Sequence, residues 1–481
     1  MYDYKTSLEK NGEIGVVDQV LHSIVYASGL PKLRLNEIVV FERGQIGLTI
    51  SLSKEVSQIL VLSHEGVKVG DKIARTGESF LLDISEDVLG KVLDSLGNPL
   101  NGVKFRAGDK RKVDIAPPLL KNRRLVVEPL ETGVPLVDLL IPIGRGQREL
   151  IIGDRKTGKT QFFIKTIANQ ARRGNVCIYA SIGKRISEIK EMLNAVEAME
   201  ANNNTVIVAT SASDAPGLIY MTPYTAMAVA EYFRDRGRHV VLILDDLTNH
   251  AVYYREISLL ARRFPGRSSY PGDIFYIHSK LLERAGNFPN GSITVFPVAE
   301  SIMGDISGYI QTNLMSITDG HIFFDAELAA LGRRPAINPF LSVTRVGQQA
   351  QSPLVRQLSH ELSSFLVTLE RLREFEHFGA ELSEEIIQKL ALGDRILEFF
   401  DQPRDVVPIN MSVLVMAMIW IGSWKNQKKE DVKVKWGKMI DEYNTGGTFK
   451  KKIDDLISKT DTYNGLLNAL RENNYGQENY Y

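Results

Sequence analysis

Eight consecutive residues have the types and spacing that hold a nucleotide phosphate. They are Gly153, Asp154, Arg155, Lys156, Thr157, Gly158, Lys159 and Thr160, which complete the pattern G-x-x-x-x-G-K-[ST]. In such a loop the glycines let backbone N–H groups close around phosphate oxygens, the lysine supplies a positive charge, and the last hydroxyl can ligate Mg²⁺. The pattern predicts binding of ATP or ADP with Mg²⁺. A glycine turn before an ordinary helix is the alternative.

The residues around this loop have the patterns of a strand and a helix. Residues 149–152 form a short, largely apolar run, and apolar residues recur at helical spacing between Phe162 and Ala168. This order places the phosphates at the N-terminus of a helix, where unpaired N–H groups and the helix dipole favour an anion. The context therefore favours the phosphate-binding loop over the simple turn.

A magnesium site also needs a carboxylate at the end of a neighbouring strand. The apolar run 240–244 is followed by Asp245 and Asp246. We assign Asp245, together with Thr160, to the metal. An acidic turn residue after a core strand is the alternative interpretation, and for Asp246 the two interpretations are equally open.

Hydrolysis needs a further group that orients or deprotonates the attacking water, commonly a carboxylate after the strand that follows the loop's helix. Residues 182–185 are Ile-Gly-Lys-Arg, so no acid stands there. Glu188 lies about one turn further on, but beside Lys190 and Glu191 it has the pattern of a solvated helix face. We therefore expect this loop to bind ATP better than it cleaves it.

A second constellation lies downstream, where Arg333 and Arg334 precede Pro335 and Arg345 lies in the segment 341–347. An arginine at a subunit boundary can stabilise the charge that develops on a phosphoryl group transferred in the neighbouring subunit, a role that lysine performs poorly. From the chemistry alone, an ordinary surface arginine is an equal alternative for Arg345.

The composition indicates a charge-balanced chain of several domains. At about 150 residues per domain, its 481 residues suggest three domains. Lysine plus arginine and aspartate plus glutamate are 58 each, which argues against a nucleic-acid partner. The only cysteine, Cys177, rules out an internal disulfide and lies in an apolar stretch typical of a core strand. We assign it no function.

Neither the N-terminal segment nor the most apolar run of the sequence suggests export or a membrane span. Residues 1–11 are polar and charged, unlike a signal peptide. The most apolar run, 411–422, is shorter than the roughly 20 residues that a spanning helix needs. We expect this run to form a buried helix in a cytoplasmic protein.

The pattern of elements predicts a multidomain α/β protein. Residues 1–84 contain short β-rich runs separated by glycines, which predicts a β-barrel. Residues 85–352 alternate apolar strands with helical segments, which predicts a P-loop, RecA-like parallel sheet with helices on both faces. Residues 353–481 begin with a long amphipathic helix and predict a helical bundle. The strands expected most clearly are 37–41, 46–52, 59–62, 176–182, 206–210 and 240–244.

Longer motifs make the sequence resemble the α-subunit of F-type ATP synthases over nearly the whole chain. Taken together, these motifs are highly specific. They are LGKVLDSLGNP (89–99), PIGRGQR (142–148), EYFR (231–234), FPGRSSYPGD (264–273), LLERA (281–285), SITDG (316–320) and RPAINPFLSVTRVG (334–347).

The resemblance implies a barrel, a nucleotide domain and a helical bundle in a ring of alternating α- and β-type subunits around a central-stalk γ-type subunit. Catalysis lies mainly on β, and the α-type chain binds nucleotide without turning it over. Arg345 matches the family arginine that reaches into the neighbouring catalytic site, which favours the finger role. The family's own phosphate and magnesium residues match Lys159, Thr160 and Asp245, and its adenine pocket matches Arg334 and Pro335, with Gln402 at its border.

The sequence also departs from the family at its nucleotide site. Lys156 replaces the usual glutamine and adds positive charge near the phosphates. The glutamine expected after the Ile-Gly pair is missing before Lys184. Ala329 or Ala330 stands where an aromatic residue is expected near the adenine, which removes stacking.

Two further departures concern partners. The N-terminal helical extension that usually holds the peripheral stalk is nearly absent, so anchoring to a conventional stator is not expected. Residues 381–385, ELSEE, resemble the acidic loop by which the β-subunit pushes on the rotor, although a capping-box helix start at Ser383 is an equal alternative.

Three functions follow as hypotheses. The first is a non-catalytic, ATP-binding α-type subunit, in ATP synthase or in a related ATPase that powers another machine, at the inner face of the cell membrane and touching the membrane only through partners. The second is a catalytic ATPase like those of secretion systems, against which the missing acid argues. The third is a ring helicase acting on RNA, against which the neutral charge argues.

Overall fold

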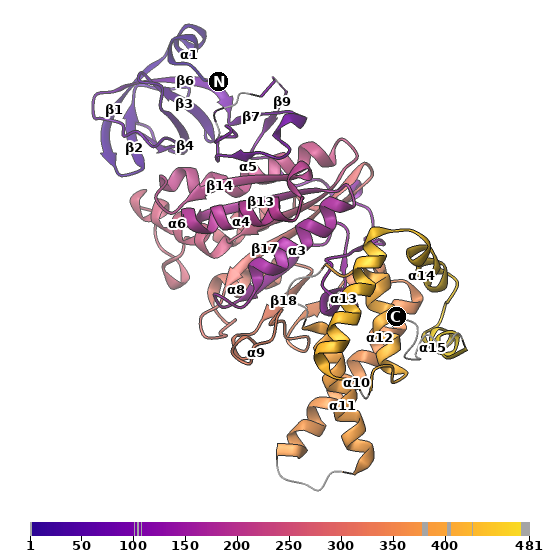
Figure 1. The fold of residues 1–481 in the computed structure, drawn as a ribbon. Coiled ribbons are helices and arrows are strands. Elements are labelled where there is room, and N and C mark those ends of the chain that lie inside the picture. The colour runs from indigo at the N-terminus through magenta and orange to yellow at the C-terminus, as the bar shows by residue number, and fades with distance from the viewer. Residues whose placement is uncertain are drawn as a thin grey trace. The chain divides into compact units, whose positions relative to one another are not determined.

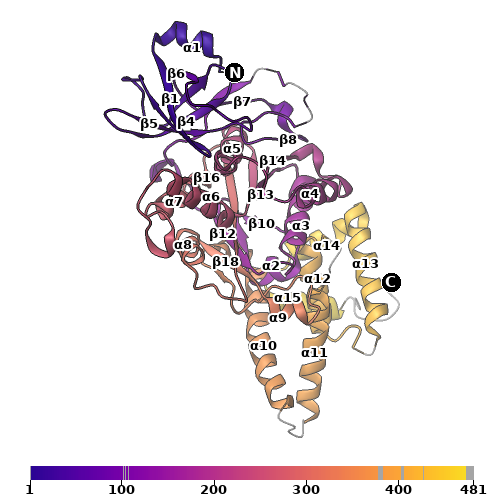
Figure 2. The ribbon, with the colours of Figure 1, turned by 90° about the vertical axis from the view of Figure 1, so that its left-hand side faces the viewer.

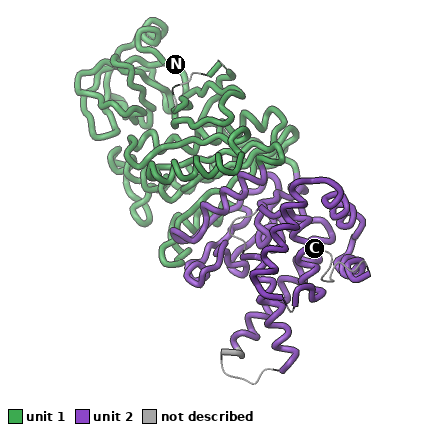
Figure 3. Tube along the Cα trace, in the orientation of Figure 1, with its two compact units in different colours: residues 1–124, 171–318 green, residues 125–170, 319–481 purple. Residues whose placement is uncertain are grey.

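The computed structural model describes residues 2–100, 102, 105–106, 108–377, 383–401, 406–425 and 427–472, apart from the side chains of residues 375–377. Contacts divide the chain into two compact units (Figure 3). The first unit contains residues 1–124 and 171–318, and the second contains residues 125–170 and 319–481. The predicted domain boundaries after residues 84 and 352 stay predictions.

The first unit begins with a closed six-stranded barrel, as the sequence predicts (Figure 1). Its strands follow the order β1-β2-β5-β4-β3-β6, and alternate side chains, among them Val39, Phe41 and Ile59, fill its core. The preceding helix α1 (Tyr4–Asn11) packs on β6. The strands are β1 (Ile14–Leu21), β2 (Ile24–Ser28), β3 (Glu37–Phe41), β4 (Ile46–Leu52), β5 (Ser57–Val61) and β6 (Lys72–Ser79).

This unit also contains a parallel sheet in the order β17-β15-β13-β14-β8, and β16 pairs with β17 antiparallel. Helix α4 lies on one side of β13, and α6 and α7 lie on the other (Figure 2). The predicted strands at 176–182, 206–210 and 240–244 are confirmed within slightly longer elements. The strands are β8 (Val92–Leu93), β13 (Val176–Lys184), β14 (Thr205–Ser211), β15 (His239–Asp245), β16 (Gly286–Phe288) and β17 (Gly291–Glu300).

Helices and a small antiparallel pair complete the first unit. The pair joins β7 (Leu81–Ile84) to β9 (Asp109–Lys112). Cys177 lies fully buried in β13, as expected of a core strand, and burial raises the pKa of its thiol to about 12. The helices are α4 (Ile186–Ala198), α5 (Pro216–Arg234), α6 (Leu247–Leu260), α7 (Ile274–Leu282) and α8 (Tyr309–Ile317).

The second unit combines a small sheet with the helical bundle. The sheet has the order β19-β18-β12, and a separate pair joins β10 to β11. The strands are β10 (Pro129–Leu130), β11 (Ile143–Gly144), β12 (Glu149–Gly153), β18 (Gly320–Phe324) and β19 (Val343–Thr344). The helices that begin in this unit are α2 (Pro135–Leu140), α3 (Lys159–Arg172), α9 (Ala326–Ala330), α10 (Pro353–His377), α11 (Glu384–Phe400), α12 (Ile409–Trp420), α13 (Lys429–Thr445), α14 (Thr448–Ser458) and α15 (Tyr463–Glu472).

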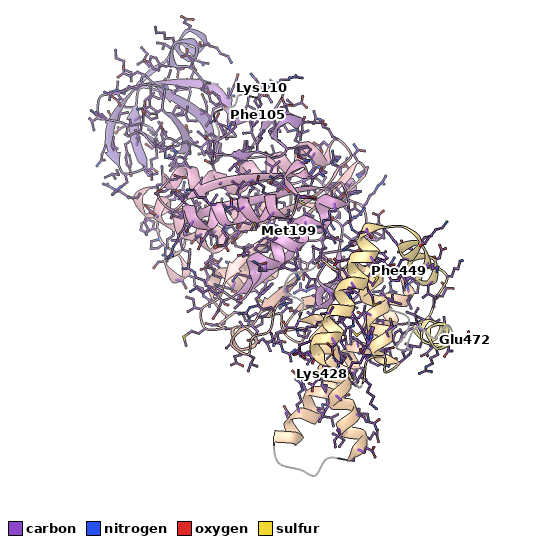
Figure 4. The ribbon with its side chains drawn as sticks, viewed as in Figure 1. Phe105, Lys110, Met199, Lys428, Phe449 and Glu472 are labelled. Atoms are coloured by element: carbon purple, nitrogen blue, oxygen red, sulfur yellow. The ribbon has the colours of Figure 1, made fainter. Side chains whose placement is uncertain are left out.

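The bundle is built around its most apolar helix. Residues 411–419 of α12 are all buried, which confirms the helix predicted there. Trp436 of α13 is also fully buried and meets Phe399 edge to face at a ring distance of 5.3 Å. Lys428 precedes α13, Phe449 lies in α14, and Glu472 ends α15 (Figure 4). Within the part of the chain that the structure describes, no helix combines the length and apolarity that crossing a membrane requires.

For residues 381–385, the structure shows how α11 begins but does not test the predicted contact with a rotor. Ser383 caps the helix, because its Oγ accepts a hydrogen bond of 3.5 Å from the N–H of Ile386. Ile386 stands where a capping box has a glutamate or glutamine, so the reciprocal bond of that motif does not form. Residues 381 and 382 lie outside the described residues, and a rotor contact stays a prediction.

One buried ion pair joins α5 to the turn that follows α7 in the first unit. The Arg284 guanidinium donates to both carboxylate oxygens of Glu231, at 3.0 and 2.7 Å, and to the carbonyl of Val113 at 2.7 Å. The two side chains are only 1% and 3% exposed. Removing either partner therefore leaves a buried charge without its counter-ion.

We predict that Glu231→Ala lowers the free energy of unfolding by about 3–5 kcal/mol, because Arg284 is left buried and uncompensated. Lys389→Ala is the matched control, since Lys389 pairs with Glu385 at 2.7 Å on the exposed surface of α11. This second change should leave the unfolding midpoint within error. Urea unfolding followed by circular dichroism measures both, and equal effects of the two variants would contradict a structural role for the buried pair.

Candidate functional site

The phosphate-binding loop follows β12, whose parallel pairing with β18 places Gly153 opposite Phe324. The two backbones approach closely here, since a Cβ on residue 153 would lie 2.3 Å from the Phe324 carbonyl oxygen. Only glycine fits at that distance. Further along the loop, Lys156 and Gly158 have positive φ angles of 65° and 102°, which turn the chain into α3.

Hydrogen bonds within the loop hold its shape. The Thr157 hydroxyl donates to the carbonyl of Asp154 at 2.7 Å. The Lys159 ammonium donates to the carbonyls of Gly153 and Asp154, at 2.8 and 2.6 Å. Arg155, Lys156 and Thr160 are exposed. The loop thus presents three cations and one carboxylate at the N-terminus of a helix, an arrangement that favours a polyanion.

Arg334 and Pro335 lie at the same end of this sheet as the loop. Phe324, the partner of Gly153 in β18, bridges to Ile337, and the N–H of Asp325 donates to the carbonyl of Ala336 at 2.8 Å. The structure therefore brings the two residues to the carboxyl end of β18. Gln402 lies outside the described residues.

Arg334 is fixed by its neighbours and borders a cavity. Its backbone N–H donates to a carboxylate oxygen of Asp401 at 2.7 Å, and its guanidinium donates to the carbonyl of Ala329 at 3.1 Å. The cavity measures about 130 Å³, and its lining includes Pro335, Leu328 and Phe400. Its largely apolar wall suits a flat ring better than a phosphate.

Arg345 lies at the opposite end of the same sheet. It directly follows β19, in which Thr344 pairs with Gly320 of β18, and Gly320 in turn pairs with Glu149 at the start of β12. The rise along β12 from Glu149 to Gly153 is roughly 13 Å at about 3.3 Å per residue. The sheet therefore separates Arg345 from the chain's own phosphate-binding loop.

The backbone on both sides of Arg345 is anchored. Its own N–H donates to the carbonyl of Asp319 at 3.1 Å, and the Thr344 hydroxyl donates to the carbonyl of Pro142 at 2.9 Å while accepting the N–H of Gly347 at 3.1 Å. A Cβ on Gly347 would overlap the Pro142 carbonyl oxygen, at 1.6 Å. The Arg345 side chain itself is exposed, and with the described residues it makes no hydrogen bond or ion pair.

Sequence reasoning missed two acids behind Arg345. Asp319 accepts two hydrogen bonds from the Arg148 guanidinium, at 2.8 and 3.1 Å. Because the Asp319 carbonyl also accepts the Arg345 N–H, Asp319 connects the residue before β12 to the backbone of Arg345. Glu149 is fully buried and accepts a 2.7 Å hydrogen bond from the Gln147 amide. Burial raises the pKa of Glu149, although the hydrogen bond from Gln147 and the charge of Arg345 both act to lower it. The sequence did contain a signal for Glu149, which is the one acid in the otherwise apolar run 149–152.

Of the predicted metal carboxylates, Asp245 ends β15 and Asp246 follows it, and a lysine contacts both. The Lys184 ammonium lies 2.8 Å from Asp245 Oδ1 and 2.9 Å from Asp246 Oδ2. The Tyr179 hydroxyl donates to Asp245 Oδ2 at 2.6 Å. Asp246 also caps α6 by accepting the N–H of Asn249 at 2.6 Å, so its structural role as a helix cap is shown.

Burial and the neighbouring charges shift the pKa values of Lys184 and Asp246. Burial alone would lower the pKa of Lys184, but the two adjacent carboxylates outweigh it and raise that pKa. Burial raises the pKa of Asp246 to about 6, and the ammonium opposes the rise. Asp245 and Thr160 belong to different units, so their joint binding of Mg²⁺ stays a prediction.

A phosphate-binding loop between a strand and a helix of an α/β protein defines the P-loop class of nucleotide-binding proteins. Residues 133–344 match the model of the ATP synthase alpha/beta family, nucleotide-binding domain. Relatives in that family are 37–41% identical to this chain over most of its length. The chain therefore belongs to the ATP synthase alpha/beta family.

Three curated relatives bear the name ATP synthase subunit alpha. The protein of Clostridium acetobutylicum is 40% identical over 423 residues, which cover 86% of this chain and 84% of the relative. That of Neorickettsia sennetsu is 41% identical over 419 residues, covering 84% and 82%. That of Ehrlichia ruminantium is 37% identical over 476 residues, covering 96% and 91%. These matches confirm the resemblance to the α-subunit that the motifs indicated.

We predict that Gly153→Ala weakens ATP binding by about tenfold or more, because the overpacking against Phe324 costs about 1–3 kcal/mol and displaces the loop. Gly437→Ala in α13 is the control, since a Cβ there meets no atom within 4 Å. Calorimetric titration with ATP compares the two proteins. Unchanged affinity in Gly153→Ala would show that the close approach of β12 and β18 does not shape the loop.

Proposed function

We propose that this chain is a nucleotide-binding, non-catalytic α-type subunit of an F-type-like rotary ATPase, and that Arg345 acts in the catalytic site of an adjacent β-type subunit. The observation that carries the proposal is the placement of Arg345: its backbone is anchored, its guanidinium is exposed, and β12 separates it from the chain's own loop. An arginine held in this way is available to another subunit's phosphates.

The chain's own loop lacks support for hydrolysis. Lys184 occupies the turn where a catalytic carboxylate would stand, and its ammonium is engaged by two aspartates. Glu188, the nearest acid along the chain, is exposed and accepts the N–H of Arg185 at 3.3 Å, which makes it a capping group of α4. The role that remains for the loop is to hold ATP or ADP.

The residues of the nucleotide site follow from the same proposal. The loop from Gly153 to Thr160 holds the phosphates, with Lys159 as its central charge. Arg334 and Pro335 border the base, together with Gln402. For the metal, the family pattern assigns Thr160 and Asp245.

The proposed partners are those of the ring. β-type subunits alternate with this chain, and a γ-type subunit forms the central stalk. Contact with a membrane, at the inner face of the cell membrane, comes only through the assembled complex, and no nucleic acid takes part.

We predict that Arg345→Ala lowers ATP hydrolysis by the complex with its β-type partner by about 10³-fold or more, the range known for arginine fingers. Arg345→Lys should not restore it, because an ammonium lacks the planar fork that matches phosphate oxygens. The control is Arg471→Ala, at an exposed position in α15. Steady-state turnover of ring-sized complexes is the measurement, and turnover unchanged by Arg345→Ala would exclude the finger role.

A second variant separates this chain's loop from its partner's catalysis. Lys159→Ala should abolish nucleotide binding by the isolated chain, because it removes the charge held beneath the loop. Turnover by the complex should stay measurable, since the chemistry occurs on the β-type subunit. Binding is measured with a fluorescent ATP analogue. Rapid turnover by the isolated wild-type chain would instead support the secretion-type alternative.

A further inference from the structure

A second cavity lies within the first unit, at the carboxyl ends of two neighbouring strands. β8 and β14 pair in parallel, with Val92 beside Ile207, so the residues that follow the two strands meet at one edge of the sheet. Helix α4 packs on β14 at the same place (Figure 2). The cavity measures about 600 Å³. Ligands of open α/β sheets bind outside the carboxyl ends of the strands, in pockets of about this size.

The wall of this cavity is largely aliphatic. Ile186, Ile189 and Leu193 of α4 recur at helical spacing and line it, and Ile186 is 56% exposed. Leu62, directly after β5, and Leu96, after β8, add to the wall. Among the described residues that line the cavity there is no Phe, Tyr or Trp. The wall therefore suits an aliphatic chain better than a planar ring, which needs a stacking partner.

The elements around the cavity are fixed to one another. A Cβ on Gly217, at the start of α5, would lie 2.4 Å from the carbonyl oxygen of Val61, so α5 and β5 approach directly. The Thr225 hydroxyl of α5 donates to the carbonyl of Ser95 at 2.5 Å and holds the turn after β8. A cavity whose walls are anchored in this way is largely preformed, which lowers the entropic cost of binding.

The two acids that border the cavity are already engaged by hydrogen-bond donors. Asp94 accepts two hydrogen bonds from Asn98, at 2.7 and 3.0 Å. Asp214 accepts the N–H of Ser211 at 2.8 Å and lies 4.0 Å from Nδ1 of His64. Because donors of their own turns use these carboxylates, they leave little capacity for a cationic ligand.

Two other polar groups at the cavity are not engaged in this way. Ser95 is fully buried, and its Oγ has no hydrogen-bond partner among the described residues. Lys190, beside Ile189 on α4, is exposed and forms no ion pair with the part of the chain that the structure describes. A buried hydroxyl without a partner is unfavourable, and a ligand oxygen that accepts its proton removes that cost. Both groups are donors, so both match a carboxylate.

We propose that this cavity binds an aliphatic carboxylate, with the hydrocarbon chain against the stripe of α4 and the carboxylate at the Lys190 ammonium. A plain hydrocarbon would leave the Ser95 hydroxyl and the Lys190 ammonium unused. The proposal goes beyond the nucleotide-binding function and does not depend on it.

The test is calorimetric titration of the full chain with decanoate, below the concentration at which it forms micelles. We expect saturable binding of one decanoate per chain. Decan-1-ol and decylamine have the same chain length without the carboxylate, and they should bind about tenfold or more weakly. Lys190→Gln should weaken decanoate binding about fivefold or more and leave decan-1-ol binding unchanged, because only the carboxylate interacts with the ammonium charge.

A second variant tests the aliphatic wall. Ile186→Glu places a charge in it at a position that is already exposed, and it should weaken decanoate binding about tenfold or more. Val434→Glu on α13 is its matched control, since Val434 is 58% exposed. Lys451→Gln on α14 is the control for Lys190→Gln, because Lys451 is also exposed. Both controls should bind decanoate like wild type, and thermal unfolding checks that each variant folds.

The outcomes are distinct. Decanoate that does not bind saturably, or that binds Ile186→Glu as it binds wild type, overturns the site. Decan-1-ol or decylamine that binds as tightly as decanoate, or decanoate binding that is unchanged in Lys190→Gln, overturns the carboxylate as the group recognised. Binding of one decanoate per chain that weakens in both cavity variants, and in neither control, supports the proposal.

Discussion

The parallel pairing of β12 with β18 is the constraint on which the site in the second unit depends. Its register places Gly153 beside Phe324 at one end and Glu149 beside Gly320 at the other. Because β19 adds to the second end, one short strand carries the phosphate-binding loop at its carboxyl end and fixes Arg345 behind its amino end. Under the proposed function, the chain binds one nucleotide at this loop and presents Arg345 to another, because the strand keeps the two apart.

The cations of the chain differ in whether they contact a carboxylate. Arg284, Arg148 and Lys184 all face carboxylates at hydrogen-bond distance, so their charges stabilise the fold and its local geometry. Arg345 differs, since its backbone is anchored while its side chain is exposed. Side-chain entropy makes an exposed arginine mobile, and anchoring its backbone restricts the volume that it searches. That restriction is consistent with the proposed finger role of Arg345.

Much of the fold was predictable because it depends on local pattern. The strand-loop-helix around Gly153, the strand that contains Cys177 and the buried helix at 411–419 all follow from the periodicity of apolar residues. The register between distant segments was not predictable: nothing local shows that Thr344 meets Pro142, or that Lys184 meets Asp245. Those contacts depend on which strands become neighbours. From the sequence, Lys184 was notable only because no acid stands at that turn. Motif resemblance, and not local chemistry, distinguished Arg345 from an ordinary surface arginine.

The most direct test of the central claim follows Arg345's position while nucleotide fills each site separately. Arg345→Cys can be labelled selectively with a fluorescent probe, because Cys177 is buried and burial raises the pKa of its thiol. In the complex with the β-type partner, the probe should respond to added nucleotide even when Lys159→Ala has disabled this chain's own loop. A response that disappears with Lys159→Ala, or that occurs equally in the isolated chain, would contradict the account.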